Sequence, residues 1–525
     1  MNRTLKTLEG MQRGKAAYLC MTALVALYSA FVLFSADGNY RGAVGAAAAA
    51  GVAALLFWLL LALSGRFHPE IRVRAARGRL KPRAFLVGFA LCACVMALYF
   101  AAFFPGGLST DSLDQWAQVQ SGQISDWHPA LHTLILLLLS RVVNHPAFAV
   151  AVQLLSLAVL CGYMTCVLEA WGFPRWFSLC AAAWVSLNPA TGNVMTFLWK
   201  DCAFALSIYL SAIYLLQAHL SRGAWLDRWQ NALALGISLA AGSILRHNGA
   251  LATVPILIWL FVSFGRKVIR PLRVTAAAAA IFLLVQGPVY SAFHVTRKSA
   301  ESNVVELSGL PMAVMGNVVK HSPEALDEDI YAFLTRVAPQ EVWDAHYALG
   351  DWNEMKWRAD KQAVAARTMP ELIDYTLRAA RANPSAAWEA LCRLWTPAIQ
   401  PFDRADWHIS PYVDASNPYG FVRSGNGFLH RILNGISRHT ATPLLAWAIW
   451  NVGFLTLCVM FLCVFCMRRA RASALLPATA IIGYNLGSML LLSTTNDFRF
   501  FYMNVLVFPL AVACLLAQQK ERPEK

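Results

Sequence analysis

The chain has 525 residues, of which 58% are hydrophobic and 14% charged, and its formal net charge is +15. A soluble protein of this length does not need so much apolar surface. Here that surface is gathered into runs of about 20 residues, the length that crosses a bilayer as a helix. The composition therefore excludes an ordinary soluble enzyme. Eleven of the 12 cysteines lie in or beside apolar runs, which also excludes an outer domain held together by disulfides.

Hydropathy predicts an all-α polytopic membrane protein with about twelve transmembrane helices. We expect a transmembrane core over 1–292, a mainly helical domain over 293–441 and C-terminal spans over 442–525. The first span follows a basic start, but it is longer than the apolar region of a cleavable signal peptide, so we expect a retained anchor. The spans are expected near 17–35, 42–64, 84–104, 146–168, 174–190, 201–220, 230–245, 249–265, 272–292, 442–467, 473–493 and 500–517.

The distribution of Lys and Arg predicts the orientation of these spans. With the N-terminus inside, the inner segments and their flanks carry 24 Lys and Arg, whereas the short outer segments carry five. Basic residues of short loops concentrate on the cytoplasmic side of a membrane. Both termini are therefore predicted to be cytoplasmic and 293–441 extracytoplasmic. Topology and attraction to anionic lipid explain the net charge, so no nucleic-acid partner is expected.

The first outward loop, 105–145, contains two candidate surface helices. Ser109 or Thr110 can cap the first helix, and Asp111 lies near its positive N-terminus. Pro129 can open a second helix over Ala130–Val143, which is apolar but short for a span. We expect both helices to lie along the membrane surface.

Four side chains of this loop are candidates for chemistry. Asp111 and Asp114 are three residues apart and share a helix face, so they can accept a proton or bind a cation; the alternative is charge complementarity with the helix terminus. His128 and His132 have the i, i+4 spacing of a metal-binding helix. Spacing alone indicates no third ligand, and contacts with substrate or packing within the loop are the other interpretation.

The order of these features resembles the opening of the GT-C superfamily. These membrane glycosyltransferases use polyprenyl-phosphate-linked sugars and include protein O-mannosyltransferases and the aminoarabinose transferases of lipid A. The blocks Ser-Thr-Asp-Ser-Leu-Asp-Gln-Trp (109–116) and Asp-Trp-His-Pro-Ala-Leu-His (126–132) also look like uncharacterised bacterial membrane proteins with GT-C-like architecture. The resemblance implies a bacterial cytoplasmic (inner) membrane location and a catalytic carboxylate at Asp111. Acceptor or substrate contacts are then expected from Asp114, Asp126, His128, His132 and Asp201.

Charged residues at other outer span ends extend the candidate site. Lys200-Asp201 begins a span, where an ionisable pair usually faces a cavity or a partner, although an interfacial anchor is the alternative. By its position, the resemblance makes Asp201 the second acidic residue of such enzymes. Arg246 interrupts an apolar stretch, and Arg499 opens the last span. Because Arg suits phosphate, we expect Arg499, with Arg246 and Lys200, to bind the donor phosphate. A local Asp497–Arg499 ion pair is the alternative.

The predicted function is transfer of a sugar from a polyprenyl-phosphate carrier to an envelope glycan, lipid or protein at the outer membrane face. Asp111 is expected to act as general base and Arg499 to stabilise the leaving phosphate. No cofactor is predicted from the residues, and a divalent cation remains an option. Two alternatives stay open, an envelope polysaccharide polymerase or ligase and a lipid-linked saccharide flippase or transporter. A flippase is expected to have charges near the bilayer midplane, and the predicted spans contain almost none.

Overall fold

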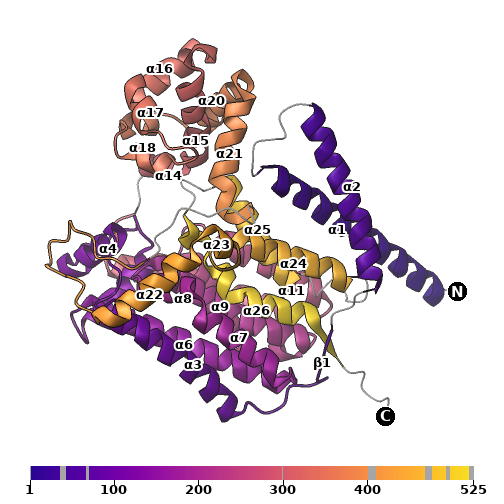
Figure 1. The fold of residues 1–525 in the computed structure, drawn as a ribbon. Helices are drawn as coiled ribbons and strands as arrows, with labels where there is room; N and C mark the ends of the chain where they lie inside the picture. The colour runs from indigo at the N-terminus through magenta and orange to yellow at the C-terminus, as the bar shows by residue number, and fades with distance from the viewer. Residues whose placement is uncertain are drawn as a thin grey trace.

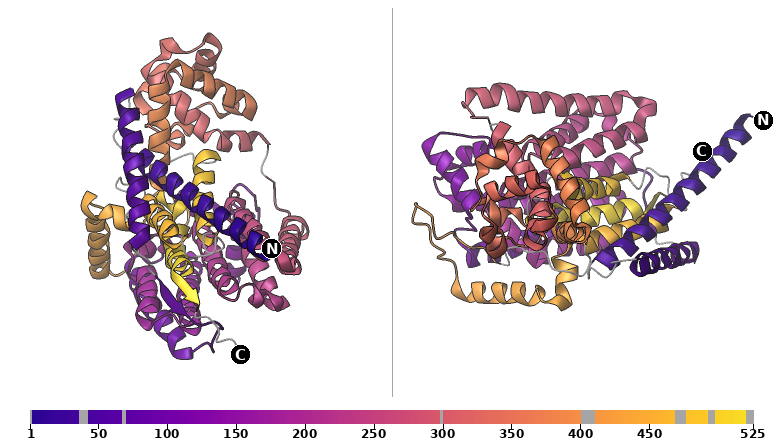
Figure 2. Two further views of the ribbon diagram at one scale, coloured as in Figure 1. Left: turned by 90° about the vertical axis from the view of Figure 1, so that its right-hand side faces the viewer. Right: turned by 90° about the horizontal axis from the view of Figure 1, so that it is seen from above.

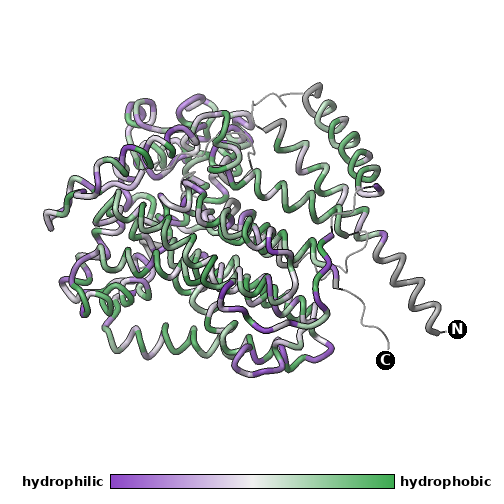
Figure 3. The backbone as a smooth tube through the Cα atoms, turned by 60° about the horizontal axis from the view of Figure 1, so that its bottom comes forward, coloured by the Kyte–Doolittle hydropathy of each residue, from purple (hydrophilic) through white to green (hydrophobic). Residues whose placement is uncertain are grey.

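The computed structural model describes residues 2–35, 43–66, 70–297, 300–399, 410–467, 476–491 and 497–519 (Figure 1). Helices make up 78% of it, so the predicted all-helical class is confirmed. Apolar residues dominate the long helices of the bundle, as the hydropathy colouring in Figure 3 makes visible. The first two helices, α1 (Asn2–Ser35) and α2 (Ala43–Arg66), pack against each other at one side of the bundle.

A central bundle contains most of the apolar helices and positions the candidate site. Its main buried cluster includes large side chains such as Trp171, Phe204 and Tyr502. Helices distant in sequence are neighbours here, since α9 packs against α26 and α3 against α6. The bundle consists of α3 (Pro82–Ala102), α6 (Pro146–Trp171), α7 (Arg175–Leu187), α8 (Pro189–Thr196), α9 (Lys200–Leu220), α10 (Trp229–Ile244), α11 (Ala250–Phe264), α12 (Ile269–Leu284), α13 (Tyr290–Ala292), α24 (Val452–Met467), α25 (Leu476–Leu491) and α26 (Met503–Leu516).

Eight described helices are long and apolar enough to cross a membrane. A ninth candidate is the pair α23 (Pro443–Ile449) and α24, which is bent by 56°. The structure therefore shows a protein with several membrane-length helices, whereas the count of about twelve stays a prediction. Three of the predicted spans fall on α7, α10 and α25, which have 13, 16 and 16 residues within the described chain.

The two predicted helices of the first outward loop are present. They are α4 (Thr110–Ser121) and α5 (Ala130–Ser140), and both lie close to their expected positions. Ser109 occupies the N-cap position of α4, but its side chain does not cap the helix. Its hydroxyl instead accepts a hydrogen bond of 2.8 Å from Nε1 of Trp199. The residue expected to cap α4 therefore joins it to the bundle.

Residues 300–399 form a helical unit with a hydrophobic cluster of its own (Figure 1, top). Trp343 and Trp352 are fully buried in that cluster, with ring centroids 6.2 Å apart. The helix that begins at Met369 is fixed by its first turn, because Thr368 and Glu371 form a reciprocal capping box. The helices are α14 (Ala300–Leu307), α15 (Gly309–His321), α16 (Glu328–Val337), α17 (Gln340–His346), α18 (Trp352–Lys356), α19 (Lys361–Ala365), α20 (Met369–Ala382) and α21 (Pro384–Ile399).

One feature was not expected from the sequence. The strands β1 (Ile71–Val73) and β2 (Ala517–Gln519) pair in parallel, with Ile71 opposite Ala517. They connect the segment between α2 and α3 to the end of α26. Strands of three residues carry little hydrophobic alternation, so a pattern search does not detect them. Like the packing of α9 against α26, this strand pair joins parts of the bundle that are distant in sequence.

Candidate functional site

Backbone pairing brings three distant segments together at one end of the bundle. Gly107 N–H donates to the carbonyl of Thr196 at 3.0 Å, and its own carbonyl accepts from Leu198 N at 2.9 Å. Leu108 N–H donates to the carbonyl of Tyr412 at 2.8 Å. The loop after α3 is thus held between the residues preceding α9 and the segment near 412. As a consequence, the N-terminus of α4 lies beside the N-terminus of α9.

The carboxylate of Asp111 lies between two cations from different segments. Its Oδ2 is 3.4 Å from Nζ of Lys200, the first residue of α9, and 3.2 Å from Nη1 of Arg499. Arg499 lies in η6 (Phe498–Phe501), the short helix that precedes α26. The Asp111, Lys200 and Arg499 side chains are 29%, 16% and 17% exposed, so a ligand can reach all three. We call this group the Asp111 cluster.

The two cations determine the protonation state of Asp111. Burial by itself raises the pKa of this carboxyl group, but the charges of Lys200 and Arg499 outweigh burial and hold the pKa well below its usual range. The carboxylate is therefore ionised at any physiological pH. Removing or occupying either cation shifts its proton affinity upward, because the attraction that lowers the pKa is then lost.

His128 adds a neutral imidazole to this cluster. Its Nδ1 lies 3.0 Å from Nζ of Lys200, and its Nε2 lies 3.7 Å from Oδ2 of Asp114. Burial lowers the pKa of His128 and the charge of Lys200 lowers it further, to about 3. The imidazole is thus uncharged at neutral pH, and its Nδ1 accepts a hydrogen bond from the Lys200 ammonium. Asp114 lies at the exposed margin, with 53% of its side chain accessible.

Asp201 and Arg246 form a buried ion pair behind the Asp111 cluster. Nη1 of Arg246 is 2.6 Å from Oδ1 of Asp201, and the two side chains are 10% and 1% exposed. The same nitrogen donates to the carbonyl of Phe500 at 3.1 Å, which also accepts from the Tyr484 hydroxyl at 3.0 Å. The pair is therefore directed at the backbone that carries Arg499, and a substrate cannot reach Asp201 directly.

Arg499 is oriented by contacts on several sides. Its Nε is 2.8 Å from Oδ2 of Asp497, and its backbone N–H donates to Oδ1 of the same residue at 2.9 Å. The predicted alternative, a local Asp497–Arg499 ion pair, is therefore present together with the contact to Asp111. The guanidinium also lies 5.0 Å from the ring centroids of both Trp199 and Phe500. These contacts keep Nη1 directed at Asp111.

Asp126 and His132 lie apart from the Asp111 cluster and have structural partners. Oδ1 of Asp126 accepts from the backbone N–H of Ala130 at 3.0 Å, at the start of α5. Nδ1 of His132 lies 3.0 Å from Oε1 of Gln115, and burial lowers the pKa of His132 to about 3. His128 and His132 do not lie on one helix, because α5 begins at Ala130 and leaves His128 outside it. The interpretation of their spacing as that of a metal-binding helix is therefore wrong.

The i, i+4 spacing of His128 and His132 therefore does not place the two imidazoles on one helix face. Among the residues that the structure describes, no group of three or more His, Cys, Asp and Glu side chains is arranged to hold a metal ion.

Sequence reasoning missed Trp199 and Tyr412 as parts of the site. Trp199 directly precedes Lys200, so it could have been included; Tyr412 reaches the site through tertiary pairing alone.

Comparison with family models, with curated proteins and with solved structures gives no match. The interpretation of this site therefore depends on its residues and their geometry.

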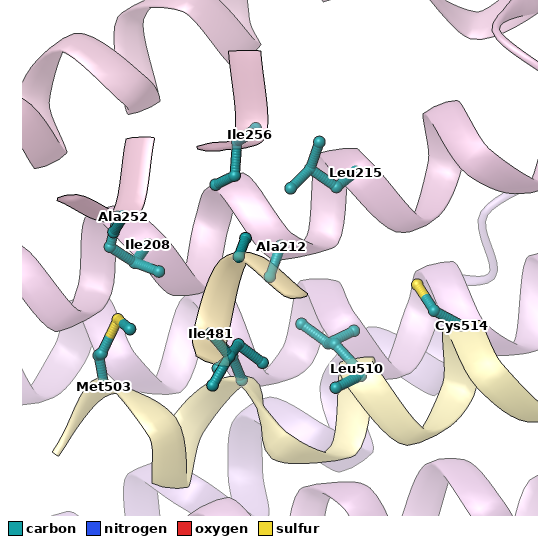
Figure 4. A pocket seen from close by; sticks show the side chains of 12 residues that line it. Ile208, Ala212, Leu215, Ala252, Ile256, Ile481, Met503, Leu510 and Cys514 are labelled. Carbon is teal, nitrogen blue, oxygen red and sulfur yellow. The ribbon is translucent and has the colours of Figure 1, made fainter. Parts of the chain in front are cut away.

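Two hollows lie away from the Asp111 cluster. The first is an apolar crevice between α9, α11, α25 and α26, with a volume of about 30 Å³ (Figure 4). Ile208, Met503 and Leu510 are among its lining side chains. This volume resembles that of a small packing gap, well below the hundreds of Å³ of a ligand site. The second, of about 410 Å³, opens beside Gln120 and Arg141 at the other end of α4 from Asp111.

Proposed function

We propose that the protein is a glycosyltransferase that moves a sugar from a polyprenyl-phosphate carrier to an envelope acceptor at the outer membrane face. The observation that carries the proposal is the Asp111 cluster, in which one ionised carboxylate contacts two cations, Lys200 and Arg499, at the ends of apolar helices. Sugar transfer from a lipid phosphate requires a base and groups that bind the phosphate, and the Asp111 cluster contains both.

The cations are suited to a phosphate because Nζ of Lys200 and Nη1 of Arg499 converge on a single carboxylate oxygen, Oδ2 of Asp111. Arg presents a planar fork and Lys a mobile point charge, and both bind phosphate oxygens. A phosphate that approaches Lys200 and Nη1 of Arg499 competes with Asp111 for the same donors. Its arrival releases the carboxylate and raises its proton affinity, since the two charges that hold down the Asp111 pKa become occupied.

In the proposed reaction Asp111 takes the proton of the acceptor hydroxyl. The acceptor oxygen forms a bond to the anomeric carbon as the bond from that carbon to the phosphate oxygen breaks. The leaving group is the polyprenyl phosphate, whose developing charge Lys200 and Arg499 stabilise. A single base and a single phosphate clamp correspond to a direct displacement with inversion.

The proposal includes the topology expected from charge. The protein would have about twelve spans in the cytoplasmic membrane, both termini inside and 293–441 outside. The count of 24 inner against five short-loop outer Lys and Arg supports this orientation. Asp111, Lys200 and Arg499 then lie together at the outer ends of their helices, where a lipid-linked donor presents its phosphate.

The test uses purified protein in proteoliposomes with polyprenyl-phosphate sugars and envelope acceptor fractions. Asp111→Asn is expected to lower transfer by at least about 100-fold, the contribution of a positioned base. Asp374→Asn is the matched control, because this carboxylate is 62% exposed on α20; it should transfer at the wild-type rate. Equal transfer by the wild type and Asp111→Asn would refute the assignment. Product length separates single transfer from polymerisation.

A further inference from the structure

The helix α22 (Gly427–Thr440) carries an apolar stripe that no described part of the chain covers. Phe428, Ile432 and Ile436 are four residues apart and share one face of the helix. Their side chains are 64%, 44% and 43% exposed. The stripe continues into α23, where Leu444 is 76% exposed. Isolated apolar residues on a surface are common, but a continuous stripe at helical spacing indicates a partner.

The opposite face of α22 packs on the same end of the bundle as the Asp111 cluster. Asn426 N–H, at the N-cap of α22, donates to the carbonyl of Ala101 at 2.7 Å, in the last turn of α3. The His430 ring lies 5.1 Å from the ring of Phe103, directly after α3. In Figure 2 (right), α22 follows one outer edge of the bundle. It is therefore placed where apolar helices end, the position of a membrane interface.

The charges around the stripe have a single sign. The chain contains no Asp or Glu between Asp414 and Asp497, whereas Arg423, Arg431 and Arg438 lie next to or within α22. Arg431 and Arg438 are seven residues apart, so they extend from one side of the helix, adjacent to the stripe. Both are exposed. An apolar face beside a purely basic margin is typical of helices that lie in the surface of an anionic bilayer.

We infer that α22 is an interfacial helix that inserts its Phe428–Ile432–Ile436 stripe among acyl chains and binds the phosphates of anionic phospholipids through Arg431 and Arg438. The partner is a lipid surface, since the apolar stripe matches acyl chains and the basic margin, which no acidic residue of 415–496 neutralises, matches anionic headgroups. The inference does not depend on the proposed sugar transfer. It adds a lipid contact at the end of the bundle that carries the Asp111 cluster.

The first test places the photoreactive residue p-benzoylphenylalanine at position 428 or at 432, in protein reconstituted in nanodiscs of zwitterionic and anionic phospholipids. Irradiation is expected to give phospholipid adducts at both positions. Trp357 is the matched control, because it is 72% exposed on the unit of residues 300–399; replacement there should give no lipid adduct. Adducts with a second copy or another protein, or no lipid adduct at 428 and 432, would overturn the inference.

The second test measures the ratio of anionic to zwitterionic phospholipid retained by detergent-purified protein. Arg431→Gln and Arg438→Gln are each expected to lower that ratio about fivefold, the equivalent of the ~1 kcal/mol that a basic residue gains at an anionic surface. Arg336→Gln and Arg358→Gln, also exposed but located in residues 300–399, should leave it unchanged. An unchanged ratio in both α22 variants would overturn the headgroup assignment.

Discussion

The buried pair of Asp201 and Arg246 leads to a stability prediction that also tests how the site is built. Two unit charges about 4 Å apart attract by ~4 kcal/mol at the effective dielectric of proteins. Removing one member of a buried pair costs about 3–5 kcal/mol, because the other charge stays buried without compensation. The pair has a contact of 2.6 Å and nearly complete burial. Asp201→Asn should therefore lower the free energy of unfolding by about 3–5 kcal/mol.

The assay is reversible unfolding in mixed micelles, with the fraction folded followed by Trp fluorescence. Asp201→Asn combined with Arg246→Met should be more stable than Asp201→Asn alone, because the unpaired charge is then absent. Asp374→Asn, an exposed carboxylate, should change the free energy of unfolding by less than about 0.5 kcal/mol. If Asp201→Asn is as stable as the wild type but binds acceptor more weakly, Asp201 contacts substrate and its assignment as a buried structural partner of Arg246 is wrong.

Three further predictions follow from the contacts of the first outward loop. Lys200→Gln should raise the Asp111 pKa, so the acidic limb of the pH profile of kcat/KM moves to higher pH. His128 has a pKa of about 3 when folded, below its unfolded value, so the unfolded state binds more protons between about pH 3 and 6.5. The contribution of His128 to the free energy of unfolding should therefore fall by up to ~1.4 kcal/mol per pH unit on acidification from pH 6.5, and His128→Gln should remove that contribution in unfolding experiments at several pH values. Gly107→Ala should destabilise the fold by ~1–3 kcal/mol, because its Cβ would lie 2.3 Å from the Phe197 ring; Gly427→Ala, with open space around its Cβ, is the control in the same denaturation assay.

Much of the helical framework was predictable because it depends on local pattern. Long apolar runs identified the membrane-length helices, and Pro129 identified the start of α5 at Ala130. The same rules misjudged His128, because an i, i+4 spacing has meaning only when both residues lie within one helix. The start of α5 at Ala130, which Pro129 predicts and the structure confirms, leaves His128 outside the helix.

The candidate site was only partly predictable, because its geometry comes from tertiary contacts. Charge at span ends placed Asp111, Lys200, Asp201, Arg246 and Arg499 near one rim, but no sequence rule separates exposed from buried members. The structure makes this division. Asp111, Lys200 and Arg499 remain accessible, whereas Asp201 and Arg246 are covered by the helices that carry them.

This division changes how the site would operate in the proposed reaction. Asp497 holds Nε of Arg499 from within the same turn, whereas Asp111, 388 residues away in sequence, holds only Nη1. A donor phosphate can therefore replace Asp111 without removing Arg499 from its anchor. The donor phosphate releases Asp111 from the two cations, and the released carboxylate takes the proton of the acceptor hydroxyl. The hydroxyl is therefore deprotonated only when a donor is bound. The arrangement favours an ordered reaction in which the lipid-linked sugar binds first.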